Sequence, residues 1–279
     1  MNEVQLPQGT IRYREQGTGE PIVLVHGLLT NGELWREVIP RLAADFRVIA
    51  PDWPLGSHRV ALGPSADLSP LGIAKLIADF IERLELERVT LVGNDTGGAM
   101  CQLVAVHHPE RLGRLVLTPC DAYEEFPPKA FVPLMAAARV PGAIFAILQS
   151  LRLPAARRLP LAYGWVTKRA DAQLTRSWIE PALQSAAIRR DAASFLSQAN
   201  KRYTLEAAER FSEFKKPVLL AWAPEDRFFK MDLGKRLERA FPEVRMELIE
   251  DSYTFVPIDQ PARTAELIGA FAREPALAH

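Results

Sequence analysis

The chain has 279 residues, of which 48% are hydrophobic and 24% are charged. This composition is typical of a folded globular protein and excludes a disordered chain. Lys and Arg number 34 and Asp and Glu also number 34, so the formal net charge is zero. A balanced charge argues against a general nucleic-acid binder, and we expect no nucleic-acid partner.

The two cysteines, Cys101 and Cys120, are too few for a disulfide framework or a four-cysteine zinc site. The N-terminus lacks the apolar stretch of a signal peptide, and the longest apolar region, 130–151, is interrupted by prolines and an arginine. We therefore expect a cytoplasmic protein without a membrane partner. The sequence indicates no metal and no organic cofactor, and it carries no signal for an oligomeric state.

Short apolar runs alternate with longer helical patterns along the chain. Runs such as PIVLVHG and RVTLVGND are apolar throughout, as expected for strands covered by helices on both faces. The alternation predicts an α/β fold with a mostly parallel sheet. Strands are predicted at 10–15, 22–25, 47–50, 89–92, 115–117, 218–222 and 245–249, and helices at 32–44, 70–84, 97–107, 233–240 and 261–272.

Residues 122–214 contain no convincing strand, only helical patterns separated by prolines. We interpret this stretch as a helical lid inserted into a core made of 1–121 and 215–279. Such insertions lie at the edge of an open α/β sheet where ligands bind. Basic residues outnumber acidic ones between Arg152 and Arg202, which indicates either solvated helix faces or attraction of an anionic substrate or partner.

The strand at 89–92 runs directly into the sequence GNDTGG, residues 93–98, and a helical pattern follows. This has the form G-x-nucleophile-x-G, in which flanking glycines let the chain turn sharply and hold the central residue out at the sheet edge. The central residue is Asp95, and a carboxylate there can attack an electrophilic carbon and form an ester. The alternative is that Asp95 merely caps the helix.

The chain resembles the α/β-hydrolase superfamily, and specifically its branch with an aspartate nucleophile, the haloalkane dehalogenases and epoxide hydrolases. Besides the motif around Asp95, the resemblance is carried by VHGLL at 25–29, PDWPLGS at 51–57 and WAPED at 222–226. It covers almost the whole chain. It implies an α/β-hydrolase fold, with an eight-stranded type of mostly parallel sheet flanked by helices and an inserted lid.

The resemblance also implies the roles of particular residues. Asp95 would be the nucleophile, and the backbone N–H groups of Leu28 and Thr96 would form the oxyanion hole. Asp226 is the first choice for the acid of the catalytic triad. Asp121, just past the sixth strand of such a fold, is the second choice. The implied activity is that of a hydrolase acting through Asp95 on a small, largely apolar organic molecule.

The histidine of the triad is missing. When the downstream Phe and Asp-Gln-Pro are used as anchors, Thr254 occupies the histidine position and Tyr253 lies beside it. No histidine lies between His108 and His279. Neither Thr nor Tyr is a good base near neutral pH, and losing a general base typically costs about 10²–10⁴-fold in rate.

Three explanations remain open. His58, which follows the fourth strand of such a fold, is the first candidate for a replacement base. Alternatively, Asp95 serves as an acid–base group in a lyase or isomerase reaction, because a carboxyl group in an apolar pocket has a raised pKa. The third explanation is a protein that binds a small ligand without converting it.

The residues that distinguish the two branches are not fully matched. The positions at which dehalogenases hold the halide carry Thr96 and Leu28 here, and Leu29 replaces the proline typical of epoxide hydrolases. Aromatic residues of the lid and of the loop after the fourth strand indicate an apolar pocket. Those expected to line it are Trp53, Tyr163, Trp165 and Trp178.

Overall fold

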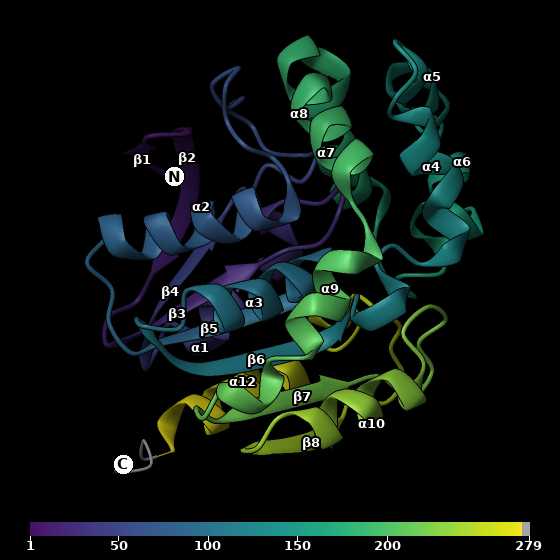
Figure 1. Ribbon diagram of the computed structural model, residues 1–279. Coiled ribbons are helices and arrows are strands. Elements are labelled where there is room, and N and C mark those ends of the chain that lie inside the picture. The colour runs from purple at the N-terminus through teal and green to yellow at the C-terminus, as the bar shows by residue number, and fades with distance from the viewer. Residues whose placement is uncertain (275–279) are drawn as a thin grey trace.

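The computed structural model describes residues 1–274, so that His279 lies outside the described part. Its centre is one eight-stranded sheet with the order β1-β2-β4-β3-β5-β6-β7-β8 (Figure 1). The strands are β1 Asn2–Leu6, β2 Gly9–Gln16, β3 Glu20–Val25, β4 Phe46–Pro51, β5 Val89–Asp95, β6 Leu112–Cys120, β7 Val218–Trp222 and β8 Val244–Leu248.

The strands from β4 to β8 along the sheet run parallel, whereas β1 and β2 pair antiparallel at one edge. Because parallel strands end at the same edge of a sheet, the residues that follow β3, β5, β6 and β7 meet there. The predicted α/β fold with a mostly parallel sheet is confirmed.

Helices cover both faces of the sheet. α2 and α3 pack against each other on one face, and α10 packs on β7 and β8, while α1 and α12 contact each other on the opposite face. The helices of these layers are η1 Gly32–Trp35, α1 Ile39–Leu42, α2 Pro70–Arg83, α3 Thr96–His107, α10 Met231–Ala240, α11 Val256–Asp259 and α12 Pro261–Arg273.

Two local expectations differ from the structure. The single helix predicted at 32–44 is divided into η1 and α1, because Pro40 has no N–H for a continuous helix and instead stands in the first turn of α1. β1 was not predicted, since its five residues contain only two buried apolar side chains, Val4 and Leu6. Such a short edge strand gives a weak alternation signal.

Between β6 and β7 the chain forms helices joined by turns and irregular loops, and we call this part the helical insertion. Its elements lie over the edge of the sheet where β3, β5 and β6 end, except α9, which packs on α3, and η5, whose Phe211 stacks on Phe241 shortly before β7 begins (Figure 1). They are η2 Tyr123–Glu125, η3 Lys129–Phe131, α4 Val132–Ala137, α5 Ala143–Ser150, α6 Pro154–Arg157, η4 Pro160–Gly164, α7 Ala172–Gln184, α8 Ala186–Gln198, α9 Lys201–Ala208 and η5 Phe211–Glu213.

The turn from β5 into α3 requires glycines on both sides of Asp95. Asp95 has a φ of 54° and a ψ of −133°, a strained conformation for a residue with a side chain. A Cβ on Gly97 would overlap the carbonyl oxygens of Val25 and His26, and a Cβ on Gly93 would overlap Gly98. The glycines therefore allow α3 to start against β3, and this close approach fixes the position of Asp95.

We expect Gly97→Ala to lower the free energy of unfolding by on the order of 3 kcal/mol, because the added methyl group meets backbone atoms that cannot move away. Guanidinium unfolding followed by circular dichroism measures this. The matched control is Gly63→Ala, whose Cβ would lie 3.3 Å from the nearest atom, the Gln8 carbonyl oxygen. Equal losses in the two variants would contradict the close approach at Gly97.

Candidate active site

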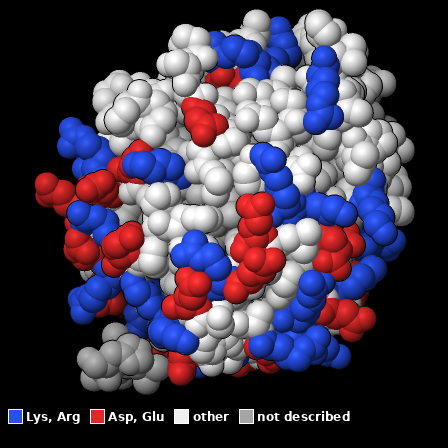
Figure 2. Space-filling view, viewed as in Figure 1, with Lys and Arg blue, Asp and Glu red and all other residues white. Residues whose placement is uncertain are grey.

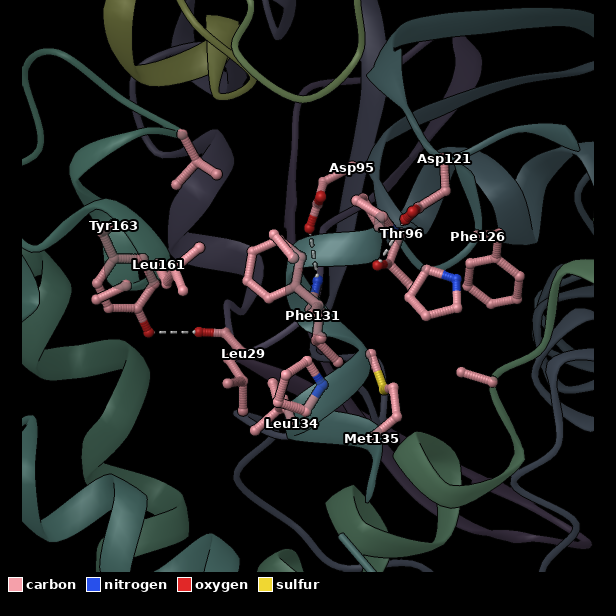
Figure 3. A pocket seen from close by; sticks show the side chains of 18 of the residues that line it. Leu29, Asp95, Thr96, Asp121, Phe126, Phe131, Leu134, Met135, Leu161 and Tyr163 are labelled. Atoms are coloured by element: carbon pink, nitrogen blue, oxygen red, sulfur yellow. Dashed lines mark hydrogen bonds between the residues drawn. The ribbon is translucent and has the colours of Figure 1, made fainter. Parts of the chain in front are cut away.

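The Asp95 carboxylate lies at the C-terminal end of β5, inside the molecule. The backbone N–H of Leu28, in the loop after β3, donates a hydrogen bond to Asp95 Oδ2 at 3.0 Å (Figure 3). The N–H of Thr96 also favours the charged form of this carboxyl group. These are the two donors that the sequence pattern predicts for an oxyanion hole, and in the structure both act on Asp95 itself.

Burial is the main influence on the acidity of Asp95. Removal from water raises its pKa to about 7, against the lowering effect of the Thr96 and Leu28 N–H groups. The charge of Asp226 raises the pKa further. Asp95 therefore exchanges a proton near neutral pH, which suits either a nucleophile or an acid–base group.

A second carboxyl group, Asp121, lies next to Asp95 beyond the end of β6. Its Oδ2 accepts a hydrogen bond from the Thr96 hydroxyl at 2.9 Å, as Figure 3 shows. Its Oδ1 is buried and has no hydrogen-bond partner among the described residues. Burial and the charge of Asp95 hold the pKa of Asp121 well above its usual range. Asp121 thus lines the same cavity as Asp95 as a second, weakly acidic group.

Asp226 follows β7 and is almost fully buried. Its Oδ1 accepts hydrogen bonds from the N–H groups of Phe228 and Phe229, both at 2.7 Å. Burial raises the pKa of Asp226 to about 6, against the effect of these donors and of the Thr254 hydroxyl. In the described part of the chain, neither Asp226 Oδ2 nor Thr254 Oγ1 is in a well-aligned hydrogen bond, although the Thr254 hydroxyl lies close enough to the Asp226 carboxyl group to lower its pKa.

Thr254 is held in place from behind. The Asn94 side chain donates to the Thr254 carbonyl at 2.7 Å, and the Thr254 side chain is fully buried. Tyr253 instead turns outward, where its hydroxyl accepts a hydrogen bond from Arg227 at 2.7 Å. Of the two residues considered at the histidine position, Thr254 faces Asp226 and Tyr253 lies outside the site.

His58 is placed away from the two cavity carboxyl groups. Its Nε2 is paired with Asp191 Oδ2 at 3.1 Å, and the Leu62 N–H donates to the same oxygen at 2.9 Å. Both side chains are about 99% buried. His58 therefore links the loop after β4 to α8 of the helical insertion and is not among the residues that line the cavity.

A cavity of about 310 Å³ lies between the sheet edge and the helical insertion. Its wall is mainly aliphatic, aromatic and proline side chains, and its ionisable groups are Asp95, Asp121 and Tyr163. Tyr163 donates its hydroxyl hydrogen to the Leu29 carbonyl at 2.9 Å, and burial raises the pKa of this hydroxyl well above its usual range. The cavity can therefore hold a small apolar molecule against two carboxyl groups.

Of the four aromatic residues expected to line the pocket, only Tyr163 does so. Trp53 is fully buried in the core, where its indole N–H donates to the Leu24 carbonyl. Trp178 packs behind the cavity wall, with its ring 5.0 Å from that of Tyr163. Trp165 is 37% exposed on the outer surface. Aromatic identity alone does not distinguish a packing residue from a lining one.

The wall is supplied largely by one segment, of which only the lid aromatics Phe126 and Phe131 are indicated by the sequence as part of an apolar pocket or its cover. The run FPPKAFVPLM, residues 126–135, contributes eight of the lining residues. The available signal was its position, since it is an apolar, proline-rich run that begins just after β6, at the ligand-binding edge of the sheet.

Comparison with known proteins places these observations in a family. The family described as alpha/beta hydrolase fold matches residues 20–261. The chain belongs to this family. Within it, the chain is 30% identical to a 2-hydroxy-6-oxononadienedioate/2-hydroxy-6-oxononatrienedioate hydrolase of Burkholderia vietnamiensis, over 85% of this chain and 82% of the relative. It is 29% identical to haloalkane dehalogenase 2 of Mycobacterium bovis, over 94% and 91% of the two chains.

Solved structures show the same α/β-hydrolase fold at lower identity. The crystal structure of DBJA aligns with a TM-score of 0.80 and 16% identity, covering 97% of each chain. The epoxide hydrolase CorEH aligns with a TM-score of 0.78 and 19% identity, covering 97% of this chain and 98% of the other.

In residues 1–274, every helix is too short or too polar to cross a bilayer, and no cluster of acidic, His and Cys side chains is arranged to hold a metal ion.

The raised pKa of Asp95 predicts a pH-dependent effect of Asp95→Asn on stability. Between about pH 4 and 7 the unfolded chain releases a proton that folded Asp95 retains, so the stability of the wild type falls as the pH rises through this interval. The amide removes this loss. We expect the gain in melting temperature of Asp95→Asn over the wild type to be larger at pH 8 than at pH 4.5.

The control is Glu243→Gln, which replaces an exposed carboxyl group and should shift the melting temperature equally at both pH values. A difference between Asp95→Asn and the wild type that is the same at pH 4.5 and pH 8 would contradict the raised pKa.

Proposed function

We propose that this protein is a hydrolase-type enzyme in which Asp95 attacks an electrophilic carbon of a small, largely apolar molecule. The observation that carries the proposal is the position of the Asp95 carboxylate, with one oxygen held by the Leu28 N–H and the group itself in the wall of an apolar cavity. The Burkholderia relative is named as a hydrolase, and the Mycobacterium relative is named as a haloalkane dehalogenase. Both names are consistent with attack on an electrophilic carbon.

The reaction proceeds through an ester. The free oxygen of Asp95 forms a bond to the substrate carbon, and the bond from that carbon to a halide or an epoxide oxygen breaks, with its electron pair leaving on that atom. The ester carbonyl oxygen then remains in the hole formed by Leu28 and Thr96. A water molecule then adds to the carbonyl carbon of the ester, and the bond from that carbon to the alkoxide oxygen breaks. One proton of the water ends on this oxygen, which leaves as the alcohol, and the other is released with the halide or taken up by the oxygen of the opened epoxide, so that Asp95 is again a free carboxylate.

The step that lacks an evident catalyst is the activation of this water. Thr254 provides no base, and His58 is engaged with Asp191. Asp121 is the second carboxyl group in the cavity, and its raised pKa makes its ionised form a stronger base than an ordinary carboxylate. The same raised pKa lowers the share of that ionised form relative to an ordinary carboxylate at the same pH. We therefore expect the ester to form faster than it is hydrolysed.

A second candidate function is acid–base chemistry or ligand binding without hydrolysis. The specific observation in its favour is the pair of neighbouring carboxyl groups, Asp95 and Asp121, whose pKa values are both raised. Such a pair holds a proton at neutral pH and can donate it to a bound molecule. This candidate predicts conversion or binding of a ligand with no covalent adduct on Asp95.

Intact-mass spectrometry after incubation with a panel of alkyl halides and epoxides tests the ester. We expect a stoichiometric adduct that maps to the peptide containing Asp95, because the ester should form faster than it is hydrolysed. The rate at which the adduct forms should increase as the pH rises through about 7, because Asp95 loses its proton there. Asp95→Asn is the control and should give no adduct. A folded wild type with neither adduct nor product across the panel would favour the second candidate.

Thr254→His should convert the trapped ester into turnover. An imidazole at this position has Asp226 Oδ2, which is in no well-aligned hydrogen bond with a described residue, as an acceptor for its N–H. General-base catalysis typically contributes about 10²–10⁴-fold. We therefore expect the lifetime of the ester, measured by time-resolved intact mass, to shorten by on the order of 10²-fold or more.

Thr254→Val is the matched control, since it keeps the volume of the side chain and supplies no base. It should leave the ester lifetime close to that of the wild type. The combined variant Thr254→His with Asp226→Asn should lose most of the gain. If Thr254→His folds, as judged by circular dichroism, and its ester persists as long as in the wild type, the arrangement of Asp226 and position 254 as a triad remnant is refuted.

A further inference from the structure

Exposed apolar side chains are concentrated on one part of the helical insertion. Of the ten large apolar side chains that are exposed among residues 1–274, seven lie between 132 and 165. Leu153 is 67% exposed, Leu159 59% and Val140 57%. We call this surface, formed by α4, α5, α6, η4 and the turns between them, the lid face. Its exposed apolar residues are Val132, Val140, Phe145, Leu153, Leu159, Leu161 and Trp165.

The charge of the same segment has one sign. No Asp or Glu occurs between Glu125 and Asp171, although the whole chain has equal numbers of acidic and basic residues. Four exposed cations of this segment form no ion pair with any described residue, unlike most basic residues elsewhere in the chain. They are Lys129, Arg139, Arg152 and Arg158.

The distribution of charge is visible on the surface. Figure 2, viewed as Figure 1, shows blue and white atoms over α4, α5 and α6 in the upper right, while the red side chains gather lower down, over the sheet, and above α7 and α8. An exposed apolar surface bordered by cations and free of anions is the pattern that binds the headgroup region of an anionic bilayer.

We propose that the lid face docks on the surface of an anionic lipid bilayer, as a peripheral contact that requires no membrane-spanning helix. The apolar side chains enter the boundary between headgroups and acyl chains, and the four cations contact lipid phosphates. Trp165, an aromatic side chain with one polar atom, suits this boundary. Spanning segments and signal peptides, on which the expectation of no membrane partner rests, are local features of a sequence, whereas a docking surface is formed by residues that the fold brings together.

The lid face continues into the cavity. Ala130, Pro133 and Leu161 are exposed and also line the cavity that holds Asp95. A small apolar molecule dissolved in the bilayer would thus meet the mouth of the cavity without crossing water. This consequence rests on the proposed function, whereas the docking itself rests only on the surface of the lid face.

Charge disfavours a second copy of the chain as the occupant of this surface. In a two-fold symmetric dimer the same patch meets itself, so the unpaired cations of one copy would face those of the other. The cations of the two copies would repel one another, because the segment contains no acidic residue that could pair with them. An anionic lipid surface supplies the opposite charge.

Vesicle binding tests the proposal with the intact protein. We expect co-sedimentation with vesicles of phosphatidylcholine containing 30% phosphatidylglycerol and little with phosphatidylcholine alone, with binding weakened at 0.5 M NaCl. Tryptophan emission should shift to shorter wavelength on binding. The shift reports on Trp165, because the other four tryptophans, Trp35, Trp53, Trp178 and Trp222, are fully buried. Trp165→Phe should remove the shift.

Paired variants separate the lid face from surface apolarity in general. Leu153→Ser combined with Leu159→Ser should weaken partitioning by roughly tenfold. Its control is Leu71→Ser with Leu248→Ser, two leucines of lower but comparable exposure on other elements. Arg152→Gln should weaken partitioning about fivefold, as should Arg158→Gln, since a cation near an anionic surface contributes ~1 kcal/mol. Arg83→Gln with Arg239→Gln is their control.

Three results would overturn the proposal. The first is no binding to either vesicle by the folded wild type. The second is equal loss of binding in the lid-face variants and their controls. The third is a dimer, measured by light scattering, that dissociates in Leu153→Ser with Leu159→Ser, which would assign the surface to a second copy. The ester assay on Asp95 is run without vesicles, so its failure and that of docking are distinguishable.

Discussion

The hydrogen bond from the Leu28 N–H to the Asp95 carboxylate is the contact on which the site depends. It joins the loop after β3 to the turn after β5, and these two segments can approach only because the residues between them are glycines. A Cβ on Gly27 would overlap the Asp95 carboxylate, just as one on Gly97 would overlap the carbonyl of His26. Backbone sterics therefore determine where the reactive group stands before any catalytic chemistry is considered.

The same arrangement concentrates acidic groups in a place from which water is removed. Asp121 and Asp226 are buried and Asp95 is partly buried, and removal from water raises the pKa of each. The nearby His26 cannot balance them, because its Nε2 accepts the Trp53 N–H and burial lowers its pKa to about 4. Among the described residues, the cavity lining has the carboxyl groups of Asp95 and Asp121 and no Lys, Arg or His, which favours the protonated form of these carboxyl groups. The reaction that the site supports then depends on which of these carboxyl groups is ionised when a substrate is bound.

The parts of the fold and the site that depend on neighbouring residues in the chain could be predicted from the sequence. The apolar strands and the glycine pattern around Asp95 are encoded within a few residues, so the sheet and the turn could be predicted. The pairing of His58 with Asp191 joins residues 133 positions apart, and the bond between Thr96 and Asp121 depends on how β5 and β6 are aligned. Contacts of this kind are set by packing between distant elements, which composition and periodicity do not describe.

The helical insertion shows why the two sides of one segment have to be considered together. Its inner residues close the cavity with apolar side chains, and this closure excludes water and raises the pKa of the carboxyl groups. Packing alone would leave the outer side free to carry acidic and basic residues alike, as the sheet-covering helices do. Instead the outer side is apolar and basic. Since exposed leucines add nothing to the closure of the cavity, an additional constraint on the outer surface, such as contact with a lipid bilayer, accounts for them better than stability does.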